Sequence, residues 1–385
     1  MSDVDQTAAD QIAPGEKNPE PAAGELHRMR QWVALRNTSM DVRGGIGISG
    51  HVAKDLRTAI GRPHACALVG EAGLSAELVD AYHRDLSAAG FDVRPLEMPG
   101  GGCDLVRAQA LAGLLLEARI TADDLVVVIG GEETLSCAAL ACSLWCGGVS
   151  LVEVPTSAPA AVISAVTPRP LDIPGGPGML RHDGAPRFSV VDVRLFDLDP
   201  THEELLHAFA HMAATAACDS NKAFERLWDS ADDLVAGDEQ VILRQLLDAV
   251  KSRGRVVAST SAATRQSIAY GEELAGALRS ILGDAVPASS LVADGLRFSA
   301  RLAVALDQLS VDDMFTQDEL LERLGLGTTE AAVDPQALVA AMREERFRRT
   351  NRFMVATPRA LGRVRLTAVP DELLEEHVTA WCASR

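Results

Sequence analysis

The chain has 385 residues, of which 47% are hydrophobic and 23% charged, and its formal net charge is −18 at pH 7. This acidic balance opposes nucleic-acid binding, because neutralising phosphates requires a positive surface. The longest apolar runs, such as 125–130, are much shorter than the roughly 18–20 residues of a membrane span. We therefore expect a cytoplasmic protein without a membrane segment or signal peptide, long enough for about two domains.

The first half of the chain alternates between strand and helix patterns. Residues 1–25 are acidic and rich in alanine and proline, which predicts a disordered tail. Strands are expected near 64–69, 91–98, 124–130, 150–155 and 187–196, and helices near 75–89, 104–119 and 134–145. The run DLVVVIG at 124–130 is apolar throughout, as in a parallel strand covered on both faces. This alternation predicts an open, mostly parallel α/β sheet.

The second half has a mainly helical pattern. Helical periodicity is expected over 202–324 and 335–345, followed by a strand pair near 352–369 and a closing helix at about 371–383. A glycine- and proline-rich passage at 155–186 lies before the change of pattern. We predict a Rossmann-like, nucleotide-binding-like α/β domain at 26–200 and a mainly α-helical domain at 201–385.

Two glycine motifs are candidates for binding a cofactor. Gly45–Gly50 matches G-x-G-x-x-G, but no acidic residue stands at a strand end about 20 residues later, which favours a simple turn. Gly130 and Gly131 follow the most apolar strand and open a helix, where an open α/β sheet normally binds its ligand. The glutamates that follow at 132–133 would repel a pyrophosphate there.

Five arginines between residues 343 and 352 form the one basic cluster of the sequence. Their guanidinium groups suit a phosphate or a carboxylate. A solvated helix end, paired with Glu344 and Glu345, is the favoured alternative.

Several segments occur in the order typical of one enzyme family. They are MDVRGGIGISGHVAKDL from residue 40, FDVRPLEMPGG (91–101), DDLVVVIGG (123–131), GGVSLVEVPTS (147–157), RFSVVDVRLFD (187–197), VADGLRFSARLAVAL (292–306) and DPQALVAAMREERF (334–347). The succession resembles 3-dehydroquinate synthase and the wider sugar-phosphate cyclase family, from about residue 40 to the C-terminus. The resemblance implies a dehydroquinate-synthase-like fold, NAD and a divalent metal, usually zinc, as cofactors, and carbocycle formation from a sugar phosphate.

The family's cofactor loop is altered in this chain. Its glycine-rich phosphate loop reads Gly130, Gly131, Glu132 here, and its P-T-T motif is nearly kept, with Thr156 in place. The resemblance implies that these four residues line the cofactor position. Because Glu132 adds a side chain and a like charge beside a pyrophosphate, we expect NAD binding to be lost.

The family's anion-binding and metal-binding residues are also replaced. Arg169 stands where the D-S-S-x-G-G-K motif has its lysine, and together with Arg346 it is our candidate for binding phosphate. The three metal ligands of the family correspond, within about one residue, to His211, Glu272 and Asp294. Two interpretations stay open: zinc, manganese or iron held by new ligands, or a polar cleft that no longer binds metal. As catalytic candidates we take His211 as the base, with Glu272 and Glu273 beside it.

Three functional hypotheses remain open at this point. The first is a diverged cyclase relative in specialised metabolism that acts on a small polar or sugar-derived molecule in the inter-domain cleft, its ancestral lyase chemistry altered or lost. The second is a non-catalytic paralogue that regulates an active homologue, for instance in a mixed dimer. The third is a relative of iron-type alcohol or glycerol dehydrogenases. Family precedent predicts a homodimer.

Overall fold

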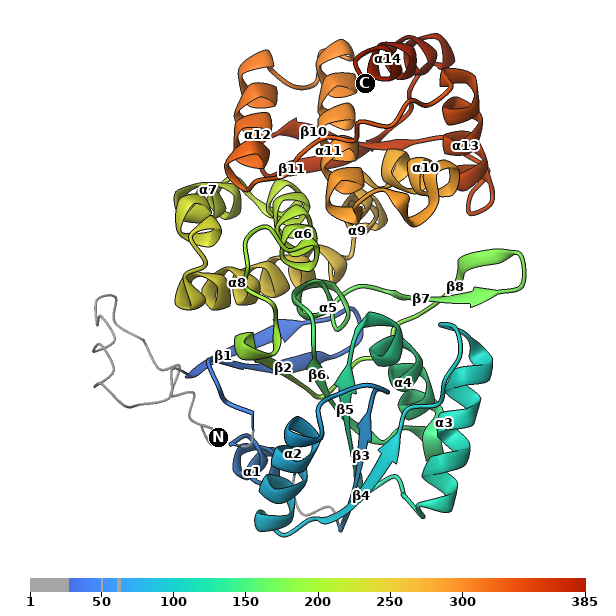
Figure 1. The fold of residues 1–385 in the computed structure, drawn as a ribbon. Coiled ribbons are helices and arrows are strands. Elements are labelled where there is room, and N and C mark those ends of the chain that lie inside the picture. The colour runs from blue at the N-terminus through green and yellow to red at the C-terminus, as the bar shows by residue number, and fades with distance from the viewer. Residues whose placement is uncertain (1–27, 50, 61–63) are drawn as a thin grey trace, which may run out of the picture.

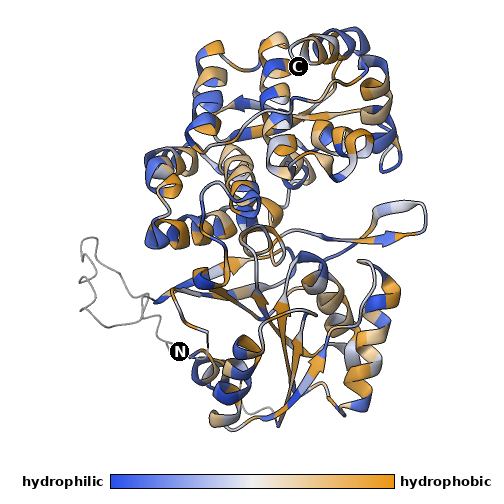
Figure 2. Ribbon diagram, viewed as in Figure 1, coloured by the Kyte–Doolittle hydropathy of each residue, from blue (hydrophilic) through white to orange (hydrophobic). Residues whose placement is uncertain are grey.

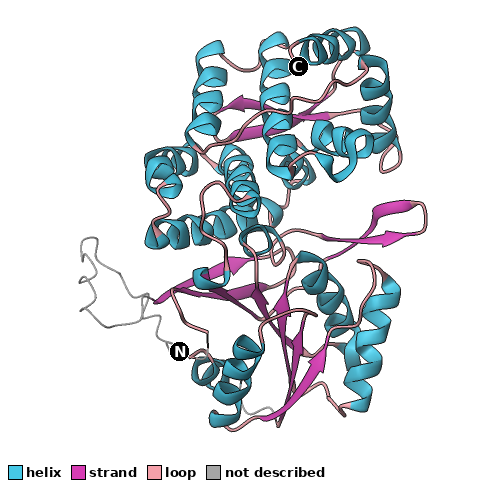
Figure 3. Cartoon of the chain, viewed as in Figure 1, coloured by secondary structure: helices cyan, strands magenta, loops and turns pink. Residues whose placement is uncertain are grey.

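A seven-stranded sheet forms the base of the N-terminal half (Figures 1 and 3). The computed structural model describes residues 28–49, 51–60 and 64–385, so the tail predicted at 1–25 and Gly50 of the G-x-G-x-x-G match lie outside it. The strands are β1 (Arg28–Ala34), β2 (Ser39–Gly45), β3 (Ala65–Gly70), β4 (Asp92–Glu97), β5 (Leu125–Gly130), β6 (Ser150–Pro155) and β9 (Phe188–Asp192). Their order is β1-β2-β9-β6-β5-β3-β4, and every pairing is parallel except β1 with β2.

Helices cover both faces of this sheet. They are α1 (Ala53–Ile60), α2 (Ala76–Ala88), α3 (Leu105–Glu117), α4 (Glu132–Leu144) and α5 (Ala158–Ile163). Along β5, Leu125, Val127 and Ile129 pack with α1 and α2, whereas Val126 and Val128 pack with α3 and α4. Every residue of β5 is therefore buried, which explains its uninterrupted apolar sequence and the hydrophobic centre of the sheet in Figure 2.

The C-terminal half packs its helices around α6, a nearly fully buried, alanine-rich helix (Glu203–Asp219). The others are α7 (Asn221–Val235), α8 (Glu239–Val257), α9 (Ala262–Gln266), α10 (Glu272–Leu282), α11 (Ala288–Ala305), α12 (Val311–Arg323), α13 (Pro335–Phe347) and α14 (Asp371–Ala383). The small antiparallel pair β10 (Val355–Ala360) and β11 (Arg363–Thr367) lies among them. One hydrophobic core joins these helices to α5 and to β1 and β2, so the two halves share buried surface. No helix in the described residues is long and apolar enough to cross a bilayer.

The glycine- and proline-rich passage contains regular structure. Besides α5, it forms an antiparallel hairpin of β7 (Arg169–Ile173) and β8 (Gly176–His182), which projects from the N-terminal half (Figure 1). The end of this hairpin reaches the chain beyond α13, because the carbonyls of Gly175 and Pro177 accept hydrogen bonds of 2.6 Å and 3.3 Å from Arg348 and Arg349. The hairpin thereby connects the two halves on one side of the space between them.

The observed architecture confirms the predicted fold class, a mostly parallel α/β sheet followed by a mainly helical part. One strand is shorter than predicted, since β9 ends at Asp192 and a short 3-10 turn follows. The Asp192 carboxylate accepts hydrogen bonds from the backbone N–H groups of Gly47 (2.8 Å) and Ser49 (2.7 Å). The described part of the G-x-G-x-x-G match is thus a turn fastened to the sheet.

Candidate functional site

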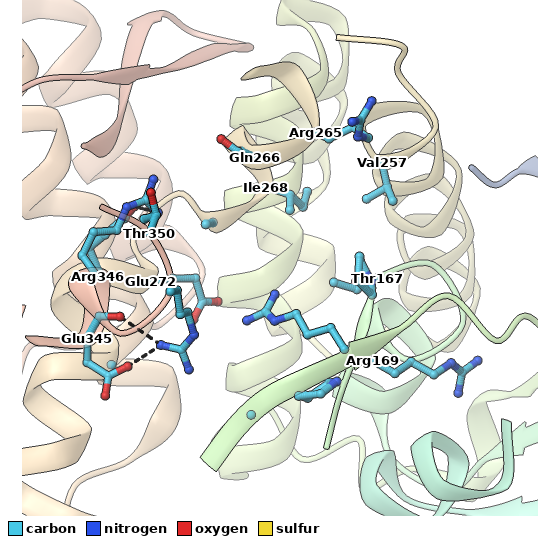
Figure 4. Close-up of a pocket in the computed structure, with 18 of the residues that line it drawn as sticks. Thr167, Arg169, Val257, Arg265, Gln266, Ile268, Glu272, Glu345, Arg346 and Thr350 are labelled. Atoms are coloured by element: carbon cyan, nitrogen blue, oxygen red, sulfur yellow. Dashed lines mark hydrogen bonds and ion pairs between the residues drawn. The ribbon is translucent and has the colours of Figure 1, made fainter. Parts of the chain in front are cut away.

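A cleft of about 1260 Å³ lies between the N-terminal and C-terminal halves. The hairpin β7–β8, the start of α4 and the loop after α5 line it from one half, and α8, α9, α10, α13 and the chain after α13 line it from the other. Figure 4 shows Glu272, Glu345 and Arg346 on the side of the C-terminal helices, opposite Thr167 and Arg169. The carboxylate of Glu272 points into the space between the two sides.

Arginine dominates the charged lining of this cleft. Nine arginines line it, against four glutamates and one histidine: Arg36, Arg169, Arg181, Arg253, Arg265, Arg346, Arg348, Arg349, Arg352; Glu132, Glu272, Glu273, Glu345; His211. The cleft is therefore basic within a chain whose formal net charge is −18. A concave surface lined by one sign of charge concentrates ligands of the opposite sign, here anions.

Two of the glutamates open helices on opposite sides of the cleft. Glu132 is the first residue of α4 and Glu272 the first residue of α10. Burial raises the pKa of Glu132, and the charge of Glu272 raises it further, so the two carboxylates lie within electrostatic reach of each other. Neither carboxylate makes a hydrogen bond or an ion pair with any residue in the described part of the chain.

Arg253 of α8 is a buried cation near these two carboxylates. Its Nε donates to the hydroxyl of Thr167 at 2.6 Å and its Nη1 to the hydroxyl of Thr215 at 3.1 Å. Burial lowers the pKa of Arg253, and the charges of Glu272 and Glu132 oppose that shift. Its guanidinium group thus influences both glutamates while donating to threonines.

The predicted residues Glu273 and Arg346 meet at the C-terminal wall of the cleft. Arg346 Nη1 lies 3.8 Å from Glu273 Oε1, and Glu273 is 8% exposed. Neither carboxylate oxygen of Glu273 has a hydrogen-bond partner in the described residues. Burial raises the pKa of Glu273 to about 7. A carboxyl group with that pKa is suited to exchange a proton at neutral pH.

The predicted anion residue Arg169 is engaged inside the protein. It is 2% exposed, lies 2.6 Å from the buried carboxylate of Glu153 on β6, and donates to the Leu135 carbonyl at 2.9 Å. Its charge is therefore balanced by Glu153 and not left for a ligand. In contrast, the Arg181 side chain on β8 has no hydrogen bond or ion pair within the described residues. Desolvation in the cleft and the neighbouring charge of Arg349 lower the pKa of Arg181.

Arg181 is a candidate site residue that the sequence analysis missed. The sequence feature that could have indicated it is the strand at 176–182, because successive side chains of a strand point to opposite faces. Arg181 lines the cleft together with Arg349, whose charge lowers the pKa of Arg181.

Known proteins with similar sequences are 3-dehydroquinate synthases. The enzyme of Rhodopirellula baltica is 22% identical over 330 residues, which cover 84% of this chain and 88% of that protein. The enzymes of Gloeobacter violaceus and Xanthomonas axonopodis pv. citri are 25% and 27% identical over 76% and 67% of this chain, and 82% and 71% of those proteins. No family model matches the chain.

The chain is dehydroquinate-synthase-like. The predicted resemblance is thereby confirmed.

Solved structures of related enzymes share the fold. A 2-deoxy-scyllo-inosose synthase complexed with carbaglucose-6-phosphate, NAD⁺ and Co²⁺ superposes with a TM-score of 0.74 at 15% identity, over 91% of this chain and 99% of that one. ValA (2-epi-5-epi-valiolone synthase) from Streptomyces hygroscopicus subsp. jinggangensis 5008, with NAD⁺ and Zn²⁺ bound, gives 0.76 at 15% identity and the same coverage. An iron-containing alcohol dehydrogenase gives 0.62 at 16% identity, over 92% of this chain and all of that one. The fold is thus also shared with the iron-type alcohol dehydrogenases of the third hypothesis.

In this dehydroquinate-synthase-like chain, other side chains of the protein pack against the loop that corresponds to the family's cofactor loop. The Glu71 carboxylate, which follows β3, accepts hydrogen bonds of 2.7 Å from the Gly131 N–H and of 2.7 Å from the Thr134 hydroxyl. A Cβ on Gly130 would lie 2.7 Å from Thr134 Cγ2 and 3.0 Å from Glu71 Oε2, so this glycine makes room for internal neighbours. The Thr156 N–H donates to the Gly130 carbonyl at 3.1 Å.

These residues do not fit the pyrophosphate of NAD. A dinucleotide places its phosphates against the free N–H groups at the start of the helix after such a strand. Here Glu71 already occupies that position, and Glu132 and Glu133 place two more carboxylates in the first turn of α4. A pyrophosphate would meet like charges and would have to displace Glu71.

The three predicted metal ligands are not brought together. Asp294 on α11 is fully buried outside the cleft lining, where it accepts hydrogen bonds of 2.7 Å from the Thr329 N–H and of 2.8 Å from Arg385. His211 and Glu272 do line the cleft. Among the residues that the structure describes, no group of three or more His, Cys, Asp or Glu side chains could hold a metal ion. The residues present therefore do not fit the metal of the family.

Burial favours the uncharged form of the His211 imidazole. Its Nε2 lies 3.1 Å from Nε2 of His207, one turn earlier on α6. Burial first, and then the charges of His207 and Arg253, lower the pKa of His211 well below its usual value. Protonating this histidine costs free energy, because burial disfavours the charged imidazolium.

Proposed function

We propose that this chain binds a small, negatively charged, sugar-derived molecule, with a phosphate as its anionic group, in the cleft between its two halves. The observation that carries the proposal is the charge of the lining, nine arginines against four glutamates in a chain of net charge −18. Arg181, Arg349 and Arg352 are the arginines we assign to the phosphate, since they come from both sides of the cleft mouth.

We infer that the chemistry of the family is altered in this chain. Glu71 fills the phosphate position of the dinucleotide, and the residues that correspond to the metal ligands lie apart. What supports a reaction is Glu273, a buried carboxyl group with a pKa of about 7 at the cleft wall. Such a group moves protons without a redox cofactor, as an isomerisation or an elimination requires. Because the motif residues of 3-dehydroquinate synthases are replaced, we place the protein in specialised metabolism.

The proposal is tested by calorimetric titration of the purified chain with glucose 6-phosphate, glucose and inorganic phosphate. We expect saturable binding of the sugar phosphate that weakens as ionic strength rises, and binding of free glucose too weak to measure. The variants R181A and R349A should each weaken sugar-phosphate binding about tenfold, the usual contribution of a charged hydrogen bond.

The matched control is R84A, because Arg84 is exposed on α2 and lies outside the cleft lining. R84A should bind as the unaltered chain does. Equal affinity for glucose and glucose 6-phosphate, or an absence of saturable binding by any phosphate, would contradict the proposal. Assembly as a homodimer, or as a mixed dimer with an active homologue, stays a prediction that light scattering of the chain alone and with that homologue checks.

A further inference from the structure

Two cysteines from different segments of the N-terminal half lie against each other. Cys103 precedes α3, Cys137 lies in the middle of α4, and both are buried free thiols. Cys137 Sγ lies 3.7 Å from the carbonyl oxygen of Asp104, the neighbour of Cys103. Cys103 Sγ in turn lies 3.9 Å from the carbonyl oxygen of Glu133, one turn before Cys137. Because each thiol contacts the backbone beside the other, the two sulfur atoms are neighbours.

Cys137 has the environment of a reactive thiol. Arg107 Nη2 donates to the hydroxyl of Thr134 at 3.0 Å, on the same face of α4 as Cys137. The hydrogen bond from Cys103 lowers the pKa of Cys137 against the effect of burial, and the charge of Arg107 lowers it further. The thiolate is the form of cysteine that reacts with oxidants. Cys103 follows the exposed glycines at 100–102, so solvent lies close to the pair.

The pair is connected to the cleft through the start of the hairpin β7–β8. The Cys103 thiol donates to the Pro170 carbonyl at 3.4 Å, and the Ser136 hydroxyl donates to the same carbonyl at 2.9 Å. The Cys103 carbonyl accepts a hydrogen bond of 2.7 Å from the Asp172 N–H. Pro170 and Ser136 both line the cleft, and the same hairpin carries Arg181. A change at the Cys103 sulfur therefore acts on the anchor of a cleft wall.

We propose that Cys103 and Cys137 form a reversible disulfide, and that this bond weakens ligand binding in the cleft. The disulfide stands on the contacts of the two thiols, whereas its effect on binding rests on the proposed function. Once the disulfide forms, Cys103 has no S–H to donate, so the Pro170 carbonyl loses one of its two donors. The wall that carries Arg181 is then held less firmly.

The oxidant is a peroxide, and the reaction has two steps. The Cys137 thiolate attacks one oxygen of hydrogen peroxide and becomes a sulfenic acid, and the hydroxide that leaves takes up the proton of the thiol to give water. The Cys103 sulfur then attacks the Cys137 sulfur and displaces its hydroxyl group, which leaves as a second water with the Cys103 proton. Two thiols and one peroxide thus give one disulfide and two waters. A dithiol reductant reverses the reaction by thiol–disulfide exchange.

The disulfide is tested on the full chain by mild treatment with hydrogen peroxide, alkylation of the remaining thiols in urea and tandem mass spectrometry. We expect two of the seven cysteines to be lost to alkylation, a cross-linked peptide that joins Cys103 to Cys137, and recovery of both thiols with dithiothreitol. C137S should form no cross-link to Cys103. The matched control is C142S, because Cys142 is another buried cysteine of α4, and this variant should form the cross-link as the unaltered chain does.

The effect on the cleft is tested by calorimetric titration of the reduced and the oxidised chain with glucose 6-phosphate. We expect oxidation to weaken binding about fivefold, the size of one ordinary hydrogen bond, and dithiothreitol to restore it. Peroxide can also oxidise Met179, which lines the cleft. C137S keeps that methionine, so its affinity should not change with peroxide if the disulfide is the cause. Thermal unfolding verifies that C137S folds, and the cross-linking of the unaltered chain needs no variant.

Each other outcome has a definite meaning. If both thiols stay free, if either pairs with another cysteine, or if Cys137 goes on to a sulfinic acid, the disulfide is overturned and the proposed function stands. If the disulfide forms but the reduced and oxidised chains bind glucose 6-phosphate equally, the coupling to the cleft is overturned. Failure of the reduced chain to bind any phosphate contradicts the proposed function and this coupling together, while the mass spectra still decide the disulfide.

Discussion

The Glu71 carboxylate lies 2.7 Å from the backbone nitrogen of Gly131 and accepts its hydrogen bond. The same carboxylate accepts from Thr134 at 2.7 Å, and Arg107 donates to that hydroxyl at 3.0 Å. An acidic side chain at the end of β3 thus caps α4, the helix that follows the neighbouring strand β5. The positive end of α4, which attracts the phosphates of a dinucleotide in folds of this kind, is satisfied from within the chain.

The first prediction concerns the stability that this cap provides. In E71Q the side chain keeps one acceptor but loses its charge and one of its two hydrogen bonds. We expect the free energy of unfolding to fall by about 1–2 kcal/mol, as for a hydrogen bond to a charged group. Urea unfolding followed by circular dichroism measures it. E133Q is the control, because that carboxylate is largely exposed, and should change stability by less than about 0.5 kcal/mol.

The second prediction concerns the dinucleotide. Because a pyrophosphate would have to displace Glu71 and approach Glu132, we expect no saturable increase in NADH fluorescence up to about 1 mM. A 3-dehydroquinate synthase titrated in parallel is the positive control. Saturable NADH binding that ADP-ribose displaces would contradict this account and would favour the dehydrogenase hypothesis.

The fold was predictable because the sheet is covered on both faces. The apolar run at 125–130 is typical of a buried strand between helix layers, and the structure places its side chains in two separate cores. The passage 155–186 was not assigned elements, since glycine and proline obscure the alternation in 176–182. Its hairpin has its own antiparallel ladder, and Arg348 and Arg349, far along the chain, donate hydrogen bonds to the carbonyls at its end.

The candidate site was predictable only in part. Family motifs indicated Glu132, Glu272 and Glu273, the arginine cluster indicated Arg346, and all four line the cleft. Sequence alone could not show that Arg169 is paired with Glu153, or that Arg385 and Thr329 satisfy Asp294. Both outcomes depend on partners distant in sequence. Glu71 was missed for the same reason, because its role appears only when β3 and β5 lie side by side.

The third prediction is a pH dependence of stability caused by Glu273. Burial raises the pKa of this carboxyl from 4.5 to about 7, so the folded state favours its protonated form. The resulting stabilisation is complete below the unfolded pKa and is lost as the pH rises through about 7. E273Q keeps a neutral side chain at every pH. Relative to E273Q, the unaltered chain should therefore lose about 2–3 kcal/mol between roughly pH 5 and pH 8.

Urea unfolding of both proteins across that pH range measures the difference. Comparing the two proteins at each pH removes the contribution of the other titrating groups, which they share. Parallel curves for the two proteins would mean that Glu273 titrates in the folded state as it does in the unfolded chain.

The fourth prediction concerns Gly295, which allows α11 to lie close to the start of α10, where Glu272 and Glu273 line the cleft. Gly271, which precedes α10, has φ of 88°, and a Cβ on Gly295 of α11 would lie 1.9 Å from the Gly271 carbonyl oxygen. G295A must therefore push the start of α10 away from α11. We expect it to destabilise the protein by about 1–3 kcal/mol, as overpacking does. We also expect it to alter sugar-phosphate binding, because Glu272, Glu273 and the Arg346 beside Glu273 line the cleft.

G113A is the matched control, a helical glycine on α3 with nothing within 4 Å of the added Cβ. That change should stabilise the protein by about 0.5–1 kcal/mol, because alanine favours helix more than glycine does. Thermal unfolding and calorimetric titration of both variants separate the two effects. If G295A unfolds and binds as the unaltered chain does, the close approach of α10 and α11 does not position the cleft glutamates.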